Sequence, residues 1–152
     1  MTVPDPHAEP AAILFSCTNN AIRSPMAAAL MRHLYGHRIF VDSVGVRAGT
    51  PDPFAAAAME EMGIDLSRHR PRTFDDLEDT SFDVIVTLSP EAHHSALELT
   101  RHMACDVEYW PTIDPSVVEG SRENRLDAYR EVRDGLMRRI KQRFGPPRPP
   151  NV

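Results

Sequence analysis

The feature that most constrains the fold is a short loop between an apolar run and a run of helix-forming residues. Ala12-Ile13-Leu14-Phe15 is typical of a strand buried on both faces of a parallel sheet. Pro25, followed by Met26-Ala27-Ala28-Ala29-Leu30-Met31, predicts the start and body of a helix. Cys17 to Ser24 (CTNNAIRS) must therefore form a tight connection between strand and helix.

Strands and helices continue to alternate along the chain. Further strands are predicted at 39–41, 84–88 and 107–110, and further helices at 54–62, 90–99 and 126–140. This alternation predicts an α/β fold in three layers: a four-stranded parallel sheet with helices on both faces. The arginines along the last helix are most simply a solvated face, balanced by acidic residues.

Length and charge limit the organisation and the partners. The chain has 152 residues, enough for one domain with a substantial core. We expect an N-terminal tail over 1–10, a single domain over 11–144 and a Pro-rich disordered tail over 145–152. The net charge of -5 argues against nucleic acid or an anionic membrane as the main partner, although it leaves room for a local basic site.

The sequence also indicates compartment and redox class. No apolar run approaches membrane-spanning length and no secretory signal is visible, so we expect a soluble, cytoplasmic protein. Cys17 and Cys105 are the only cysteines and lack the spacing of metal ligands. We therefore expect two free thiols, no disulfide, no metal site and no cofactor.

The loop after the first strand carries the chemistry. In an open parallel sheet, ligands bind beyond the carboxyl ends of the strands, where Cys17 is expected to lie. A helix N-terminus binds anions and favours a thiolate, and the Arg23 guanidinium can hold two phosphate oxygens. Asn19 and Asn20 tolerate left-handed backbone angles, and Ser24 could donate to the thiolate. The alternative is a chance pairing of an arginine with a buried core cysteine.

The loop and four later segments resemble the low-molecular-weight protein tyrosine phosphatases, a superfamily that includes arsenate reductases. The similarity runs from about Ile13 to about Ile140, and its segments are Cys17 to Ser24, Asp42-Ser43-Val44-Gly45, Gly63 to Arg70, Phe82-Asp83-Val84-Ile85 and Asp114-Pro115. The resemblance implies that Cys17 is the nucleophile, forming a cysteinyl-phosphate, and that Asp114 is the general acid. Phosphate would be held by Arg23 and the rest of the loop: Thr18, Asn19, Asn20, Ala21, Ile22 and Ser24.

The same resemblance implies a set of residues that brace the loop, namely Asn20, Ser24, Ser43 and His69. Without it, Ser43 would be ordinary loop polarity and His69 an exposed histidine. Asp114-Pro115 alone would indicate only a turn or a helix N-cap.

Several positions depart from the family pattern. Members commonly have glycine at the position of Asn19 and often a second, protective cysteine at that of Ile22. The segment 46–51 has no aromatic residue to stack a phenyl ring. Phe54, Tyr109 and Trp110 are candidates to supply one, but we expect all three to pack in the core. The short loop is more similar to the arsenate reductase branch. Thioredoxin-coupled reductases, however, use two further cysteines, one falling at Ser89, and both are missing.

Three functions follow from these residues. The leading prediction is a tyrosine-phosphatase-like phosphomonoesterase acting on a phosphoprotein or small aryl phosphate. The first alternative is a single-cysteine arsenate reductase that uses an external thiol or glutaredoxin. The second is a non-catalytic phosphate-binding regulatory module. We expect a monomer or weak dimer.

Overall fold

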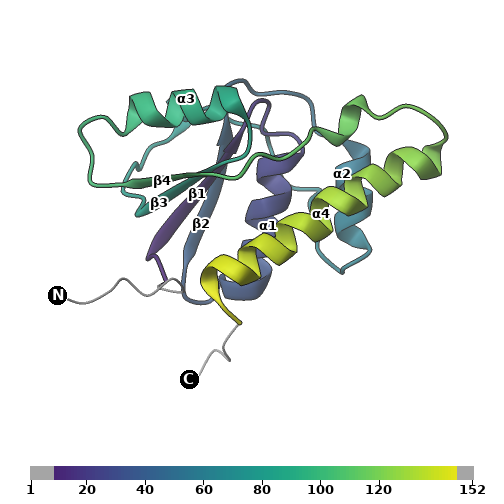
Figure 1. Cartoon of the computed structure of the whole chain (residues 1–152), viewed down its shortest axis with the longest axis horizontal. Coiled ribbons are helices and arrows are strands. Elements are labelled where there is room, and N and C mark those ends of the chain that lie inside the picture. Colours follow the sequence, from purple (N-terminus) through teal and green to yellow (C-terminus); the bar gives the residue numbers. More distant parts are fainter. Residues whose placement is uncertain (1–8, 147–152) are drawn as a thin grey trace.

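A parallel sheet forms the centre of the computed structural model, which describes residues 9–146 (Figure 1). Its strands lie in the order β2-β1-β3-β4. They comprise Ala12–Cys17 (β1), Phe40–Gly45 (β2), Val84–Thr87 (β3) and Asp106–Tyr109 (β4). All three pairings are parallel, which confirms the predicted four-stranded parallel sheet.

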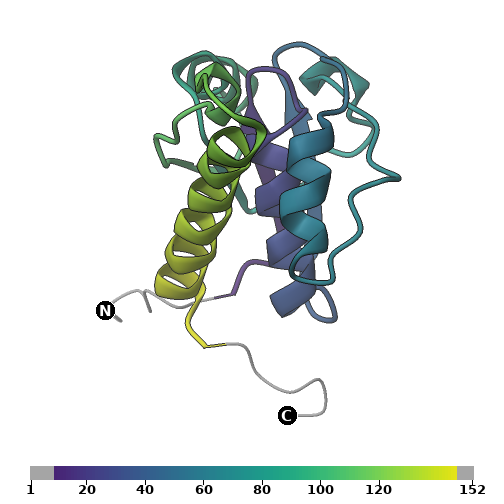
Figure 2. The same ribbon diagram turned by 90° about the vertical axis from the view of Figure 1, so that its right-hand side faces the viewer.

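Helices cover both faces of this sheet, as predicted. They comprise Arg23–Tyr35 (α1), Pro53–Glu60 (α2), Pro90–Leu99 (α3) and Arg122–Phe144 (α4). α3 covers one face, while α1, α4 and α2 lie on the other, with α4 and α2 in front of α1 in Figure 2. No helix in the described part of the chain is long and apolar enough to cross a membrane.

The central strand β1 contributes side chains to two hydrophobic clusters, because its alternate side chains point to opposite faces of the sheet. Ile13 and Phe15 belong to the large cluster with α1 and α4, whereas Leu14 belongs to the small cluster that includes Ala96 of α3. Burial on both faces explains the continuous apolar run.

Several boundaries differ from the sequence expectation. α4 spans Arg122–Phe144 and so exceeds the predicted 126–140, and β1 continues to Cys17. β2 extends to Gly45, because its polar residues Asp42 and Ser43 lie beside other chain segments instead of facing water. α1 begins at Arg23, two residues before Pro25. α2 ends at Glu60, and Gly63 adopts φ 74° in the turn after it. The predicted tails fall largely outside the described residues, so the domain boundaries stay a prediction.

The long helix α4 is more than a solvated face. The guanidinium groups of Arg130 and Arg133 both reach Glu61, just after α2, at 2.7 and 2.8 Å. The hydrogen bonds from Arg130 and Arg133 lower the pKa of Glu61 to about 2, against the opposing effect of burial. The arginines thus join α4 to α2.

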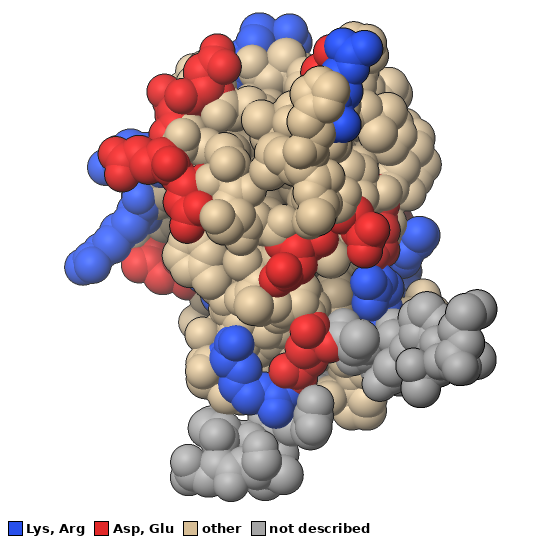
Figure 3. All heavy atoms as spheres, turned by 90° about the vertical axis from the view of Figure 1, so that its left-hand side faces the viewer, with Lys and Arg blue, Asp and Glu red and all other residues tan. Residues whose placement is uncertain are grey.

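On the face drawn in Figure 3, acidic and basic side chains lie in small separate groups.

Candidate active site

The loop predicted to hold an anion lies at the carboxyl end of the sheet, between β1 and α1. Its outer edge is fixed because the carbonyl oxygens of Cys17, Thr18 and Asn19 accept hydrogen bonds from the backbone N–H groups of Val46, Arg47 and Gly49, at 3.1, 2.8 and 2.8 Å. Asn20 turns the chain with φ 51°, the only positive φ of a non-glycine residue in the described chain.

The inner edge of the loop is a row of backbone donors. Among the described residues, none of the backbone N–H groups of residues 18–22 donates to another protein group. The first turn of α1 adds the N–H of Arg23, because the Ser24 N–H donates to Cys17 Sγ and Pro25 has no N–H. Such a row of N–H groups at a helix N-terminus binds oxyanions.

Cys17 is the last residue of β1 and is 1 % exposed. Its Sγ lies 3.0 Å from Ser24 Oγ, and the backbone N–H of Ser24 donates to it at 3.4 Å. Asn20 Nδ2 donates to Ser24 Oγ at 2.9 Å, which leaves the hydroxyl proton free to point at the sulfur or at the Val44 carbonyl. One backbone N–H thus donates to the sulfur, and the Ser24 hydroxyl is placed to add a second donor, an arrangement that favours a thiolate.

The brace residues meet around Asn20, which is fully buried. Its Nδ2 donates to Ser43 Oγ at 3.0 Å as well as to Ser24, and its Oδ1 accepts from the backbone N–H of Arg72 at 2.8 Å. The Nε2 of His69 lies 2.7 Å from the Asn20 carbonyl. The structure thus brings together all four residues expected to brace the loop. It adds Arg72, for which the sequence carried no signal.

His69 is half-buried, in contrast to the alternative of an exposed histidine. Burial lowers the pKa of its imidazole, and the charges of Arg32 and Arg72 lower it further against the opposing effect of the Asn20 carbonyl. The ring is therefore neutral at pH 7, and its Nε2–H donates to Asn20.

Arg23 connects the loop to the segment that carries Asp114. Its Nη1 donates to the carbonyl of Thr112 at 3.0 Å. Asp114 caps the short 3-10 helix Pro115–Val117, with Oδ1 accepting from the Ser116 N–H and hydroxyl at 2.9 and 2.7 Å. Its other oxygen, Oδ2, has no hydrogen bond from the residues that are described. Asp114 therefore caps the turn with Oδ1, as its sequence context indicated, and its Oδ2 is left to carry a proton.

A third side of the loop carries a residue that the sequence did not suggest. Thr18 Oγ1 lies 2.9 Å from Ser89 Oγ and 3.2 Å from Glu91 Oε2. Hydrogen bonds from its own backbone N–H and from Thr18, helped by the charges of Arg23 and Arg47, lower the pKa of Glu91. A negative carboxylate therefore stands beside the loop, and Ser89 places a hydroxyl where a relay cysteine would be needed.

The aromatic candidates lie mainly in packing contacts. Trp110 is 3 % exposed and meets Phe15 edge-on at 6.2 Å. Phe54 stacks on Tyr129 at 5.3 Å. Tyr109 is exposed and stacks on His93, not in the core. Residues 9–146 contain no group of three or more His, Cys, Asp or Glu that could hold a metal ion.

Comparison with known proteins places these observations in context. A family model described as "Low molecular weight phosphotyrosine protein phosphatase" matches residues 12–144. An arsenate reductase of Bacillus subtilis is 32% identical over 130 residues, covering 86% of this chain and 92% of the relative. An arsenate reductase of Shouchella clausii is 34% identical over 131 residues, with the same coverage of 86% and 92%.

Solved structures show the same architecture. The YwlE arginine phosphatase, in a form with a phosphorylated active-site serine, superposes with a TM-score of 0.70 at 26% identity, covering 86% of this chain and 91% of its own. An arsenate reductase in a phosphate-binding state gives a TM-score of 0.67 at 26% identity, covering 86% and 93%.

Proposed function

The chain belongs to the low-molecular-weight phosphotyrosine protein phosphatase family of cysteine-dependent enzymes, and from that premise we propose that it is an arsenate reductase with a single reactive thiol. The observation that carries the proposal is the name shared by its relatives at 32% and 34% identity, both arsenate reductases. This name favours the arsenate reductase alternative over the phosphomonoesterase that the sequence put first. The absence of aromatic residues from segment 46–51 agrees with a small inorganic substrate.

The reaction begins at Cys17. Its thiolate attacks the arsenic of arsenate, an S–As bond forms, and one arsenate oxygen leaves as water after taking up protons. The loop N–H groups and the Arg23 guanidinium hold the remaining oxygens, because arsenate has the tetrahedral shape and charge of phosphate. The Asp114 Oδ2 is the candidate proton donor for the departing oxygen.

The thiol that completes the reduction of arsenic must come from outside the chain. Position 89 is serine, and Cys105 precedes β4 at the amino end of the sheet, opposite to Cys17. An external thiolate therefore attacks Cys17 Sγ, the S–As electron pair passes to arsenic, and arsenite leaves. A second external thiol reduces the mixed disulfide. In total, arsenate and two thiols give arsenite, one disulfide and water.

The test is arsenite formation by the purified chain with glutathione, with and without glutaredoxin. We expect turnover that is lost in Cys17→Ser and kept in Cys105→Ser. A wild-type protein that forms no arsenite under these conditions contradicts the proposal.

A second candidate is hydrolysis of a phosphomonoester, and the unoccupied Asp114 Oδ2 favours it. Cys17 would attack phosphorus, Asp114 would protonate the leaving oxygen and then deprotonate the water that cleaves the cysteinyl-phosphate. The substrate would be a phosphoprotein or a small phosphate ester. The structural similarity to the YwlE arginine phosphatase, which was captured with a phosphorylated active-site serine, supports transfer of a phosphoryl group to the side chain of residue 17.

Asp114→Asn separates the two candidates. For phosphate ester hydrolysis, we expect kcat to fall by about 10² to 10⁴-fold with little change in phosphate affinity, since a general acid is lost. Arsenite formation should fall less, because the S–As bond is broken by an incoming thiol. A protein that binds phosphate but turns over neither substrate would instead be the non-catalytic module.

A further inference from the structure

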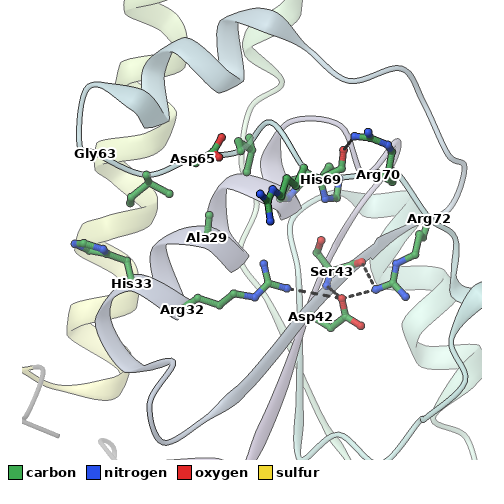
Figure 4. A pocket seen from close by; sticks show the side chains of 14 residues that line it. Ala29, Arg32, His33, Asp42, Ser43, Gly63, Asp65, His69, Arg70 and Arg72 are labelled. Atoms are coloured by element: carbon green, nitrogen blue, oxygen red, sulfur yellow. Dashed lines mark hydrogen bonds and ion pairs between the residues drawn. The ribbon is translucent and has the colours of Figure 1, made fainter.

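A second polar cavity of about 580 Å³ lies beside the catalytic loop, between α1, the edge strand β2 and the segment 63–72 (Figure 4). Arg32 lines it from α1, Asp42 and Ser43 line it from β2, and Arg68 and Arg72 line it from the segment. Cys17, Arg23 and Asp114 do not line it, so the cavity is separate from the candidate active site. Its volume is in the range of small-molecule sites.

The charge of this cavity is opposite to that of the chain. Four arginines line it, Arg32, Arg68, Arg70 and Arg72, against the carboxylates of Asp42 and Asp65. Its two histidines are His33 and His69. The whole chain, in contrast, has a net charge of -5. A local excess of guanidinium groups in an acidic protein creates a positive potential that attracts an anionic ligand.

Asp42 does not neutralise this excess. In Figure 4 the guanidinium groups of Arg32 and Arg72 approach it from different sides. Arg72 forms a close hydrogen bond with Asp42 Oδ1, Arg32 Nη2 lies 3.9 Å from the same oxygen, and the Ser43 N–H donates to it at 2.8 Å. One carboxylate is thus shared by two arginines. Within the described chain, Arg68 has no hydrogen bond or ion pair.

The charge of Arg72 also repels that of Arg32. Burial is the main cause of the lowered pKa of Arg32; Asp42 opposes it, and Arg72 lowers the pKa further by a smaller effect than that of Asp42. An anion bound between the guanidinium groups would relieve this repulsion and complete their hydrogen bonding.

The rest of the lining is apolar and sits close to the arginines. Pro25 and Ala29 of α1 contribute buried surface, and Ile64 and Leu66 contribute side chains from the segment. We propose that the cavity binds a phosphate group, free or carried by a small organic molecule, through Arg32, Arg68 and Arg72, and that its occupancy controls Cys17. An organic part would lie against Ala29, Ile64 and Leu66.

A continuous hydrogen-bond chain connects this cavity to the nucleophile. It starts where the Ser43 N–H donates to Asp42, and continues from Ser43 Oγ to Asn20 Nδ2 at 3.0 Å. From Asn20 Nδ2 it passes to Ser24 Oγ at 2.9 Å, and from there to Cys17 Sγ at 3.0 Å. The backbone N–H of Arg72 also holds Asn20 Oδ1. A ligand that draws Arg32 or Arg72 away from Asp42 therefore acts on the first member of the chain.

Binding is tested in an Arg23→Gln protein, whose catalytic loop has lost its phosphate clamp. Inorganic phosphate or phenyl phosphate is titrated while the backbone amide NMR shifts of residues 63–72 are recorded. We expect saturable shifts, and at least tenfold weaker binding when Arg32→Gln and Arg68→Gln are added. Arg68→Gln alone should weaken binding at least threefold, which covers the case in which the triple variant fails to fold.

Arg101→Gln in the same background is the matched control, since Arg101 has a side chain 68% exposed and does not line the cavity. Tighter binding of phenyl phosphate assigns an organic phosphate, and equal affinity assigns free phosphate. Absence of saturable shifts in Arg23→Gln contradicts the site. If Arg101→Gln weakens phosphate binding as much as Arg68→Gln does, the site is contradicted as well.

Control of Cys17 is tested by its alkylation rate in the same Arg23→Gln protein. Saturating phenyl phosphate should change the rate of iodoacetamide modification at Cys17 at least threefold. With Arg68→Gln added, the same change should require at least threefold more phenyl phosphate, while Cys105 serves as the internal reference. An unchanged rate at full occupancy would overturn the coupling and leave the binding site standing.

Discussion

The two cysteines of this chain stand at opposite ends of the same parallel sheet. Cys17 closes β1 at the carboxyl end, and Cys105 precedes β4 at the amino end. Through Val84, the register places Asp106 level with Ile13, so Cys17 and Cys105 are offset by about 16 Å along the strand direction. No disulfide can join them across that distance.

Their surroundings differ more than their exposure suggests. Cys17 is buried, yet Ser24 offers it both a hydroxyl and a backbone N–H. Cys105 is more exposed, but partial burial and the charges of Asp106 and Asp83 raise the pKa of its thiol. The end of the strand, and the donors gathered there, therefore decide which thiol can react.

Replacing each cysteine in turn gives the largest expected contrast. Cys17→Ala should lower turnover of arsenate or of a phosphate ester by at least about a thousandfold, because the covalent intermediate cannot form. Cys105→Ala should change turnover less than about twofold. Initial rates of both purified proteins measure this. Comparable losses in both would mean that the two thiols act together.

Substitutions of Asn20 should destabilise the loop at the carboxyl end of the sheet, where Cys17 lies, and leave the end with Cys105 unaffected. Asn20→Ala removes the donors that orient Ser24 and places alanine at φ 51°, so the free energy of unfolding should fall by about 2–4 kcal/mol. Asn20→Gly tolerates that φ and should lose about 1 kcal/mol less. Urea unfolding gives both values. Equal losses would show that backbone conformation contributes nothing to the difference.

Anionic and neutral alkylating reagents sharpen the contrast between the thiols. Iodoacetate should modify Cys17 at least about tenfold faster than Cys105 at pH 7, because the loop attracts its carboxylate and Cys105 is kept protonated. With neutral iodoacetamide the ratio should be smaller. Mass spectrometry of the labelled peptides measures both ratios, and 50-fold excess phosphate should protect Cys17 alone. Faster labelling of Cys105 would reverse the comparison.

The smallest effect concerns pH. The pKa of His69 is lowered from 6.5 in the folded state, so above pH 6.5 the ring is neutral both folded and unfolded. As the pH falls below 6.5, the unfolded chain takes up the proton first, and the free energy of unfolding decreases. Urea unfolding at pH 7.5 and 5.5 should therefore show a larger loss in the wild type than in His69→Gln. An equal loss contradicts a neutral, donating His69.

Much of the fold was predictable because its signals are local. The run Ala12 to Phe15 and the helix formers after Pro25 mark a buried strand and its helix, and these predictions were confirmed. β2 was predicted too short, since Asp42 and Ser43 look like loop residues until the structure shows what surrounds them. Local patterns cannot report contacts made by distant segments.

The candidate site divides in the same way. Cys17, Arg23 and Ser24 share one loop, and the sequence alone pointed to them. Thr18 meets Glu91 because β1 and β3 end side by side at the carboxyl end of the sheet. Asn20 meets Arg72 because the neighbouring Thr73 pairs with Gly45 at the end of β2. Gly45 is similarly explained by the close approach of the loop, since a Cβ there would lie 2.7 Å from the Asn20 nitrogen.

The sequence by itself determined the order of strands and helices along the chain and pointed to the loop from Cys17 to Ser24, because both depend on residues that are neighbours along the chain. Only the tertiary structure decided that Cys105 lies far from Cys17, that Arg130 and Arg133 hold α4 to α2, and that Arg32, Arg68 and Arg72 share one cavity. These relations depend on how parallel strands and helices pack, which brings charges together regardless of their separation in sequence.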